Sequence, residues 1–332
     1  MLYYNKLLYY NIFMINRIQI YILVLFFVLF SLISTANAEI KVVVSIKPIH
    51  SLVSYIMDGV GKPDVIVDGY NSPHNFSLKP SHAKMLESAD LVVWVGEDLE
   101  TFLEKPLNTI AKKAKNIEVM NLKGIKKLKF REKNIFEEHD DHKEHDDHKE
   151  HDDHKEKDIH EGHAHGEHDP HVWLDPINAK FIIKEITKQL VQLDAKNSSI
   201  YKSNSKKAAV EIDKLIKDIK KNLNKDLRFV VFHDAYQYFE NRFDIQVLGA
   251  LTVNTDVMPG AEQLSKIRKV IEHEKVNCLF SEPQFNPAII KSIAKDTSVK
   301  IGILDPLGAK LNKGKNLYFN LLKDMSSSFK GC

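Results

Sequence analysis

The chain has 332 residues, of which 43% are hydrophobic and 28% are charged, and its formal net charge at pH 7 is +2. This length allows two domains. The near balance of charge gives no electrostatic case for binding nucleic acid, so we expect no nucleic-acid partner.

Residues 1–38 form the first predicted element, a secretory signal peptide. Arg17 precedes an apolar run at residues 18–30, and small residues follow this run as far as Ala38. This order predicts cleavage after Ala38, and a start at Met14 would still leave a signal of ordinary length. The alternative is a retained membrane anchor, for which the apolar run is short.

The first half of the mature chain alternates strand-like and helix-like segments. We predict strands at residues 40–46, 64–70, 91–97 and 117–123. Helices are predicted between them, at residues 50–60, 81–89 and 98–115. Strands that alternate with helices indicate an α/β fold.

The second half continues with two helices, at residues 177–194 and 197–224. In the longer helix Ile212, Leu215 and Ile219 recur at spacings of three and four, which places them on one face. Strands are then predicted at residues 228–234, 245–253, 277–284 and 300–307. The helices that alternate with them are predicted at residues 235–243, 261–275, 287–296 and 317–332.

These elements predict an α/β protein with two lobes joined by a long rigid helix. The N-terminal lobe comprises residues 39–136 and 169–196, and a disordered histidine-rich loop occupies residues 137–168. The connecting helix spans residues 197–225, and the C-terminal lobe spans residues 226–332. Open α/β sheets bind ligands at the carboxyl ends of their strands, so we expect the site in the cleft between the lobes.

The histidine-rich loop contains HDDHKE three times in succession, at residues 139–156. Eleven of the sixteen histidines lie in residues 137–171. Short charged repeats cannot bury a core, which predicts disorder. Such a tract can bind zinc, copper or nickel in many arrangements of similar energy. We therefore interpret the tract as an accessory and expect the main site among histidines in ordered sequence.

Three histidines occur where ordered sequence meets the expected cleft. His233 directly follows the strand-like FVVF, His74 follows the second predicted strand, and His171 begins HVWLDP after the tract. The ends of strands are where α/β sheets bind ligands. The three histidines together are therefore the candidate metal site.

The remaining histidines and the two cysteines have other predicted roles. His82 and His273 fall in amphipathic helical segments and are expected to face solvent, whereas His50 could line the cleft. Cys278 and Cys332 are an even pair in a secreted chain, which predicts a disulfide that ties the C-terminus to the body. The alternative is two unrelated thiols.

Long segments of the mature chain resemble the ZnuA family, the periplasmic zinc-binding subunits of bacterial zinc ABC importers. The segments are SIKPIHSLVSYIMDGV, HNFSLKPSHAKMLESADLVVWVGEDLETFLEKP, HVWLDP, FVVFHDAYQYFE, LTVNTDVMPGAEQL, SEPQFNPAII and GILDPLG. The histidine-rich tract is also typical of the family. The resemblance implies two α/β lobes joined by a rigid helix, with zinc in the cleft. It also implies a monomer in the periplasm that delivers Zn²⁺ to an inner-membrane permease and its ATPase.

The resemblance further implies that His74, His171 and His233 are the zinc ligands. Three imidazoles suit Zn²⁺, whereas Mn²⁺ prefers more carboxylate, and related manganese-binding proteins have a carboxylate in place of His233. Some family members carry an acidic residue just before the first ligand, where this chain has Pro73. The fourth donor is therefore water or Asp305, which ends a predicted strand and matches an aspartate that manganese-binding relatives use. We expect Asp305 to contact the metal or one of its ligands.

Two other functions are compatible with three histidine ligands. A zinc hydrolase also combines three ligands with an open position, but it needs a general base. Glu282 in SEPQF is the acid at a strand end that suggests itself, and the chain has no HExxH pair. An adhesin-like protein with a structural metal is the third class. We favour a binding protein without enzymatic activity.

Overall fold

The computed structural model describes residues 39–131 and 166–332, apart from residues 225, 253–254, 256–258 and 296, together with Met14, Arg17, Gln19 and Tyr21. The predicted cleavage site after Ala38 and most of the histidine-rich tract lie outside the described residues. Residues Ile40–Cys332 form one compact unit. Within the described ranges, no helix is both long enough and apolar enough to span a membrane.

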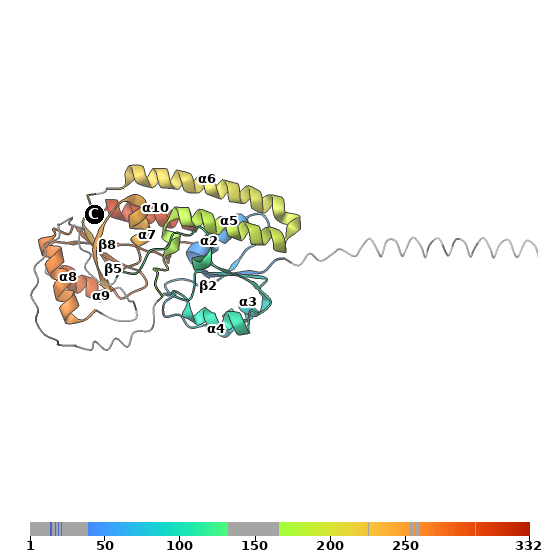
Figure 1. Cartoon of the computed structure of the whole chain (residues 1–332), viewed down its shortest axis with the longest axis horizontal. Helices are drawn as coiled ribbons and strands as arrows, with labels where there is room; N and C mark the ends of the chain where they lie inside the picture. Colours follow the sequence, from blue (N-terminus) through green and yellow to red (C-terminus); the bar gives the residue numbers. More distant parts are fainter. Residues whose placement is uncertain are drawn as a thin grey trace, which may run out of the picture. The chain divides into compact units, whose positions relative to one another are not determined.

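The first sheet has four parallel strands in the order β2-β1-β3-β4. All residues of β1 and β3 are buried, because the sheet is covered on both faces. In Figure 1, α3 and α4 lie below this sheet, and α2, α5 and α6 lie above it. The strands are β1 (Val42–Ile46), β2 (Asp64–Val67), β3 (Leu91–Trp94) and β4 (Lys115–Glu118). The helices are α2 (Lys47–Ile56), α3 (Pro80–Ser88), α4 (Thr101–Thr109) and α5 (Pro176–Leu193).

The second sheet repeats this topology with parallel strands in the order β6-β5-β7-β8. Its strands are β5 (Phe229–His233), β6 (Val247–Thr252), β7 (Cys278–Ser281) and β8 (Lys300–Ile303). Its helices are α7 (Gln237–Phe243), α8 (Ala261–His273), α9 (Ala288–Lys295) and α10 (Leu317–Lys330). In each sheet the strand order reverses beside the first strand, β1 or β5, and open α/β sheets bind ligands at the carboxyl ends of the strands at such a point. The prediction of two α/β lobes is confirmed.

Several predicted boundaries are wrong, among them the end of β4 and the start of α2. The strand predicted through residue 123 ends at Glu118, and a 3₁₀ turn at Val119–Asn121 follows it. The helix predicted from His50 already begins at Lys47, because Pro48 fits the first helical turn, where its missing N–H costs nothing.

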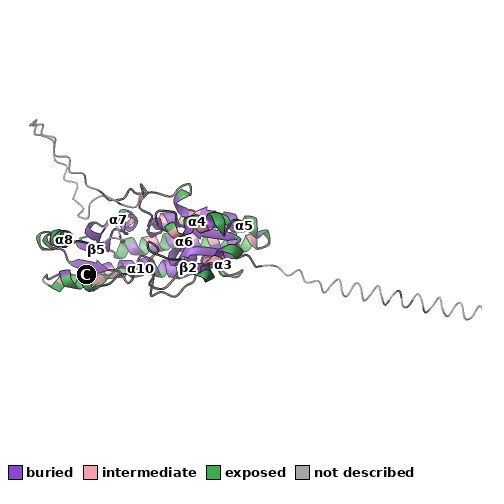
Figure 2. Cartoon of the chain, turned by 90° about the horizontal axis from the view of Figure 1, so that it is seen from below, coloured by how far each residue is buried: buried purple, intermediate pink, exposed green. Residues whose placement is uncertain are grey.

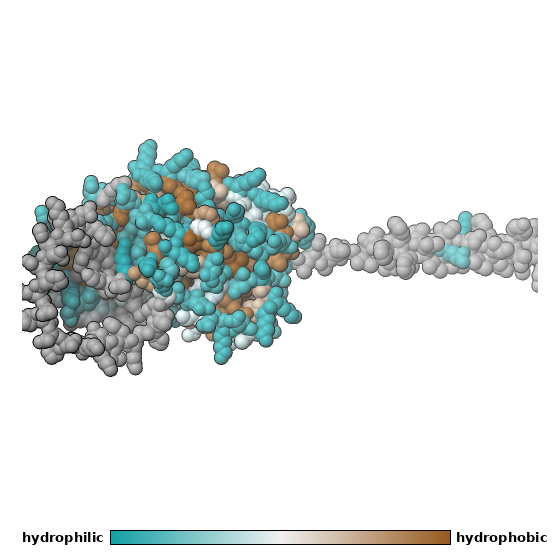
Figure 3. All heavy atoms as spheres, in the orientation of Figure 1, coloured by the Kyte–Doolittle hydropathy of each residue, from teal (hydrophilic) through white to brown (hydrophobic). Residues whose placement is uncertain are grey.

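The long helix α6 (Ser198–Asn222) has 25 residues, about 38 Å at 1.5 Å per residue. It lies alongside α5 and also contacts α2 and α10 (Figure 1). Its buried stripe comprises Tyr201, Asn204, Ala208, Ile212, Leu215 and Ile219. Lysines occupy much of the opposite face, so the side chains along the upper edge in Figure 3 are mostly hydrophilic. The period of apolar residues in the sequence therefore predicted the packed face correctly.

One hydrophobic core joins the two halves of the molecule. It includes the first sheet, α2, α5, α6 and α10, and it continues to Phe229 and Phe280 of the second sheet. A smaller cluster lies on the other side of the second sheet, against α8 and α9. Figure 2 shows buried residues along the helices that connect the halves. Because the two sheets share a core, sliding one against the other would break close packing.

Cys278 and Cys332 form a disulfide, with a Cα–Cα distance of 5.9 Å. The predicted pairing is therefore present, and it attaches the end of α10 to β7. Phe329, near the same end of α10, packs against the rings of Phe229, Phe239 and Phe280. The C-terminal helix is thus held covalently and by aromatic packing.

We expect the double replacement of Cys278 and Cys332 by serine to lower the free energy of unfolding by up to about 4 kcal/mol. The disulfide spans 54 residues, and a loop of this size restricts the unfolded chain by roughly that amount in the chain-entropy model. Zinc affinity should be unchanged, because neither cysteine lies near the histidines. Denaturant titration of the oxidised protein and of the double variant measures the difference, and equal stabilities would contradict the prediction.

Candidate metal centre

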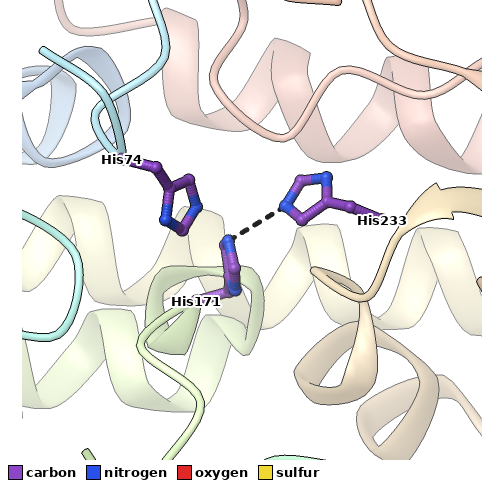
Figure 4. Close-up of side chains that lie close together, drawn as sticks. All are labelled: His74, His171 and His233. Carbon is purple, nitrogen blue, oxygen red and sulfur yellow. Dashed lines mark hydrogen bonds between the residues drawn. The ribbon is translucent and has the colours of Figure 1, made fainter. Parts of the chain in front are cut away.

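His74, His171 and His233 come together in the structure (Figure 4). One ring nitrogen from each lies within 4.8 Å of the others, and the described part of the chain contains this one group of three or more metal-binding side chains. His74 lies in the loop between β2 and α3. His171 directly precedes the 3₁₀ turn Val172–Leu174, and His233 is the last residue of β5. Two separate sheets thus supply the site.

A buried carboxylate orients each of two rings. His171 Nδ1 lies 2.7 Å from Asp169 Oδ1, and His233 Nδ1 lies 2.6 Å from Glu282 Oε1. With Nδ1 of both rings bonded to a carboxylate, the Nε2 atoms point at each other across 3.4 Å (Figure 4). Two nitrogens bound to one tetrahedral zinc at 2.0–2.1 Å are about 3.3–3.4 Å apart. This pair of rings therefore already has the spacing of two tetrahedral zinc ligands.

The two rings differ in proton affinity. Burial, with the neighbouring His233, holds the pKa of His171 well below its usual value. Burial also acts to lower the pKa of His233, but the carboxylates of Glu282, Asp234 and Asp169 together outweigh this effect and raise the pKa of that ring. A hydrogen bond between the facing Nε2 atoms needs one proton, and the raised pKa favours His233 as the ring that carries it. A metal ion that enters must displace this proton.

The cavity beside the histidines is small and is lined by both polar and apolar side chains. It is lined by Ser72, Pro73, His74, His171, Trp173, His233, Glu282, Gln284, Phe285, Pro306 and Leu307. The cavity volume is about 10 Å³, close to the minimum that one water molecule needs. This size suits one ion with a small fourth donor.

Asp305 is not part of the three-histidine group. Its carboxylate accepts hydrogen bonds from the backbone N–H groups of Leu307 (3.2 Å), Gly308 (2.9 Å) and Ala309 (2.6 Å), and from Gln284 Nε2 (2.9 Å). These bonds shape the turn after β8. The structure gives this side chain a local structural role and supplies the carboxylates beside the histidines from Asp169 and Glu282.

The turn that Asp305 shapes connects the two halves of the molecule. Buried Lys47, at the start of α2, donates to the carbonyl oxygens of Gly308, Ala309 and Leu311. Trp173 Nε1, two residues after His171, donates to the carbonyl oxygen of Pro306. Through this turn, Asp305 acts on the relative placement of the two halves.

Asp305→Asn is expected to leave zinc affinity close to that of the unmodified protein and to reduce stability. Asparagine lacks the negative charge that accepts hydrogen bonds from three backbone N–H groups. We expect its loss to lower the free energy of unfolding by about 1–3 kcal/mol. Calorimetric zinc titration and denaturant unfolding separate the two effects. A large loss of zinc affinity at unchanged stability would contradict this prediction and show that Asp305 belongs to the metal site.

Sequence reasoning missed the role of the two orienting carboxylates. Glu282 was considered as the base of a hydrolase, and Asp169 was not considered. The position of Glu282 in the sequence could have indicated this role. Glu282 directly follows β7, and β7 pairs with β5, which carries His233. Asp169 lies two residues before His171, close enough for its side chain to reach both the ring and the backbone N–H of that residue.

His50, His82 and His273 lie outside the site. His82 was expected to face solvent, and this is wrong: it is buried, stacks on Phe76 and accepts a hydrogen bond from the backbone N–H of Lys79 at the start of α3. His50 does not belong to the three-histidine group, and its Nε2 bonds with the carbonyl oxygen of Pro63. His273 is exposed, as predicted.

Comparisons with known proteins agree with this geometry. The model of the ZnuA family, described as "Zinc-uptake complex component A periplasmic", matches residues 42–332. The high-affinity zinc uptake system protein ZnuA of Brucella abortus (strain 2308) is 44% identical over 311 residues, which cover 90% of this chain and 93% of that protein.

Two solved structures have the same fold. A crystal structure of ZnuA matches with a TM-score of 0.70 at 23% identity, over 88% of this chain and 98% of that one. A ZnuA deletion mutant with zinc bound matches with a TM-score of 0.66 at 22% identity, over 86% and 95% of the two chains. At these identities the structures show the fold, whereas the family model and the Brucella abortus protein show the family. The chain belongs to the ZnuA family of periplasmic zinc-uptake components.

Proposed function

We propose that this protein captures Zn²⁺ in the periplasm through His74, His171 and His233 and delivers it to an inner-membrane ABC permease and its ATPase. The observation that carries the proposal is the pair of facing Nε2 atoms, 3.4 Å apart and each backed by a carboxylate. Membership of the ZnuA family and the zinc-bound relative support the choice of ion.

The charges of the site suit a divalent ion that must also be released. Zinc brings +2, and the carboxylates of Asp169 and Glu282 stand one shell behind the ligand rings, where they offset this charge without binding the ion. Uptake then exchanges the proton of His233 for zinc. Three neutral imidazoles favour Zn²⁺ over Mn²⁺, which prefers carboxylate and water oxygens. The fourth donor we propose is a water molecule in the small cavity.

The structure favours a binding protein over a zinc hydrolase. The cavity beside the histidines is small, with space on the scale of one water molecule, and this suits a bound ion better than an ester or a peptide. Glu282, the acid that suggested a general base, is bonded to His233 Nδ1 instead. Turnover assays of the zinc-loaded protein with ester and peptide substrates test the alternative, and zinc-dependent hydrolysis would overturn the proposal.

Growth under zinc starvation tests transport against a purely structural metal. A strain that lacks this gene should grow poorly with a zinc chelator, and the intact gene should restore growth. The gene with His171→Ala should not restore it, although the protein accumulates in the periplasm. Full rescue by that variant would mean that the metal site does not serve uptake.

Deletion of residues 138–165 should lower the total zinc bound per molecule and leave one tightly bound equivalent. The deletion spares the ordered histidines, and the short charged repeats it removes bind metal without fixed geometry. Calorimetric titration in the presence of a competing chelator counts tight and weak sites separately. Adding His74→Ala to the deletion should abolish the remaining tight equivalent, and loss of tight binding by the deletion alone would place the main site in the tract.

A further inference from the structure

Helix α7 binds the chain on both sides of the histidine-rich tract. Its Tyr238 hydroxyl accepts from the backbone N–H of Leu128 (2.9 Å) and donates to the carbonyl oxygen of Asp169 (2.7 Å). Its Arg242 forms a two-pronged pair with Asp175, with both distances at 2.7 Å. Helix α7 begins four residues after His233, so it links this ligand to the segments that flank the tract.

The two segments that flank the tract form a stem, residues 128–131 and 166–169. An antiparallel bridge joins Lys129 to His168. The backbone N–H of Asp169 donates to the carbonyl oxygen of Leu128 (2.9 Å), and that of Phe130 donates to the carbonyl oxygen of Glu167 (3.4 Å). The chain therefore enters and leaves the tract at one fixed place beside the metal site.

Each side of the stem contacts the surroundings of one zinc ligand. On the returning side, Asp169 is fully buried and holds both the ring and the backbone N–H of His171. On the outgoing side, Arg131 reaches Asp234, the residue after His233, with an Nη1–Oδ1 distance of 2.8 Å. The same guanidinium contacts both oxygens of Glu240 on α7, at 2.7 and 3.2 Å.

We propose that Arg131 is a positioning residue of the zinc site, so that this one side chain of the stem, in contrast to the tract itself, is part of the binding machinery. The inference rests on the zinc-binding function proposed above. By pairing with Asp234 and Glu240, Arg131 fixes the segment that carries His233 against the stem that carries Asp169 and His171.

The energetic reason is the burial of the two carboxylates. Asp234 and Glu240 are about 95% buried, with exposures of 5% each. Burial raises the pKa of Glu240 to about 7, and Arg131 is the neighbour that opposes this rise most. Removing the cation would leave two buried carboxylates close together without a positive charge between them, which is strongly destabilising. The local backbone around Asp234 would shift to relieve this, and His233 would move with it.

Arg131→Met tests the proposal, with Lys129→Met as the matched control. Lys129 is two residues away on the same stem and also forms an ion pair, with Glu167, but both partners are exposed. We expect Arg131→Met to weaken zinc binding by about tenfold or more, as losses of groups behind metal ligands do. Lys129→Met should bind zinc like the unmodified protein. Equal affinities of the two variants would overturn the proposal.

If Arg131→Met does not fold, Arg131→Lys tests the positioning role of Arg131 instead. Lysine keeps the buried positive charge but lacks the planar fork that contacts both carboxylates. Weakened zinc binding by this variant supports the positioning role, and full affinity overturns it.

A spectroscopic readout separates positioning from a general loss of stability. Co²⁺ placed in the site reports the geometry of its ligands through its visible absorption. We expect a changed Co²⁺ spectrum in Arg131→Met measured well below its unfolding temperature, and an unchanged one in Lys129→Met. An unmodified protein that binds no zinc would refute the proposed function itself, whereas normal binding by both variants would refute only this inference.

Discussion

Replacement of any one of His74, His171 or His233 by alanine is expected to weaken zinc binding by about 10²- to 10³-fold. Zinc sites with four protein ligands bind with about 10–16 kcal/mol, so one ligand contributes about 3 kcal/mol, and each 1.4 kcal/mol is a factor of ten. Water can replace a lost imidazole, but it is a weaker donor. The ring nitrogens of the three histidines lie within 4.8 Å of one another, so we expect all three variants to be affected.

The measurement is a competition titration with a chelator of known affinity, made in protein that lacks residues 138–165, so that the tract cannot mask the loss. His273→Ala is the matched control, because this histidine is exposed on α8 and should contribute nothing. A histidine whose removal leaves the affinity at the control value does not belong to the site.

Glu282→Gln is expected to weaken zinc binding by about tenfold to a hundredfold near neutral pH. Glu282 orients the ring of His233 through Nδ1 at 2.6 Å and supplies one of the two negative charges behind the ligands. Glutamine preserves the shape and removes the charge. Asp305→Asn is a matched control, because it removes the charge of a carboxylate that serves the turn after β8.

The same variant should also shift the pH dependence of binding. The pKa of His233 is raised above its usual 6.5 because nearby carboxylates, Glu282 first among them, together outweigh the effect of burial. Protonated His233 cannot bind zinc, so affinity should fall as the pH drops through this raised value, which lies above pH 6.5. In Glu282→Gln the largest opposing charge is gone, and the fall should move to lower pH. Parallel pH profiles for the variant and the unmodified protein would contradict this role of Glu282.

The effect of pH on the stability of the metal-free fold through His233 is opposite to its effect on zinc affinity. A raised pKa in the folded state means that protonated His233 stabilises the metal-free protein below pH 6.5, and this contribution is lost as the pH rises through the folded-state pKa. Lower pH should therefore increase the contribution of His233 to the stability of the metal-free fold, and the same proton competes with zinc. Thermal unfolding with and without zinc across this range measures both effects.

Much of the fold could be predicted from the sequence, because its elements have strong local patterns. The run IKVVVSI is apolar on both faces and became the central strand β1, and the spacing of Ile212, Leu215 and Ile219 marked the packed face of α6. His233 could be identified as a candidate because it ends a buried strand, and strand ends of α/β sheets meet at one edge.

The remaining features depend on which distant segment each side chain contacts, and the sequence does not specify this. Asp305 and Glu282 both follow a strand of the second sheet, so strand position alone could not distinguish them. The turn after β8 brings three backbone N–H groups to Asp305, whereas the pairing of β5 with β7 brings Glu282 to His233. His82 was predicted on a solvated face, but its ring stacks on Phe76 from the preceding loop. Contacts between distant segments, such as Arg131 with Glu240, carry no local pattern.

The most direct test of the proposed zinc site is X-ray absorption at the zinc edge of the 1:1 complex, with residues 138–165 deleted. Three imidazole ligands and one further oxygen at about 2.0–2.1 Å are expected, in a four-coordinate shell. A spectrum that requires one imidazole or none, or a shell of five or six oxygens, would contradict a site made by His74, His171 and His233.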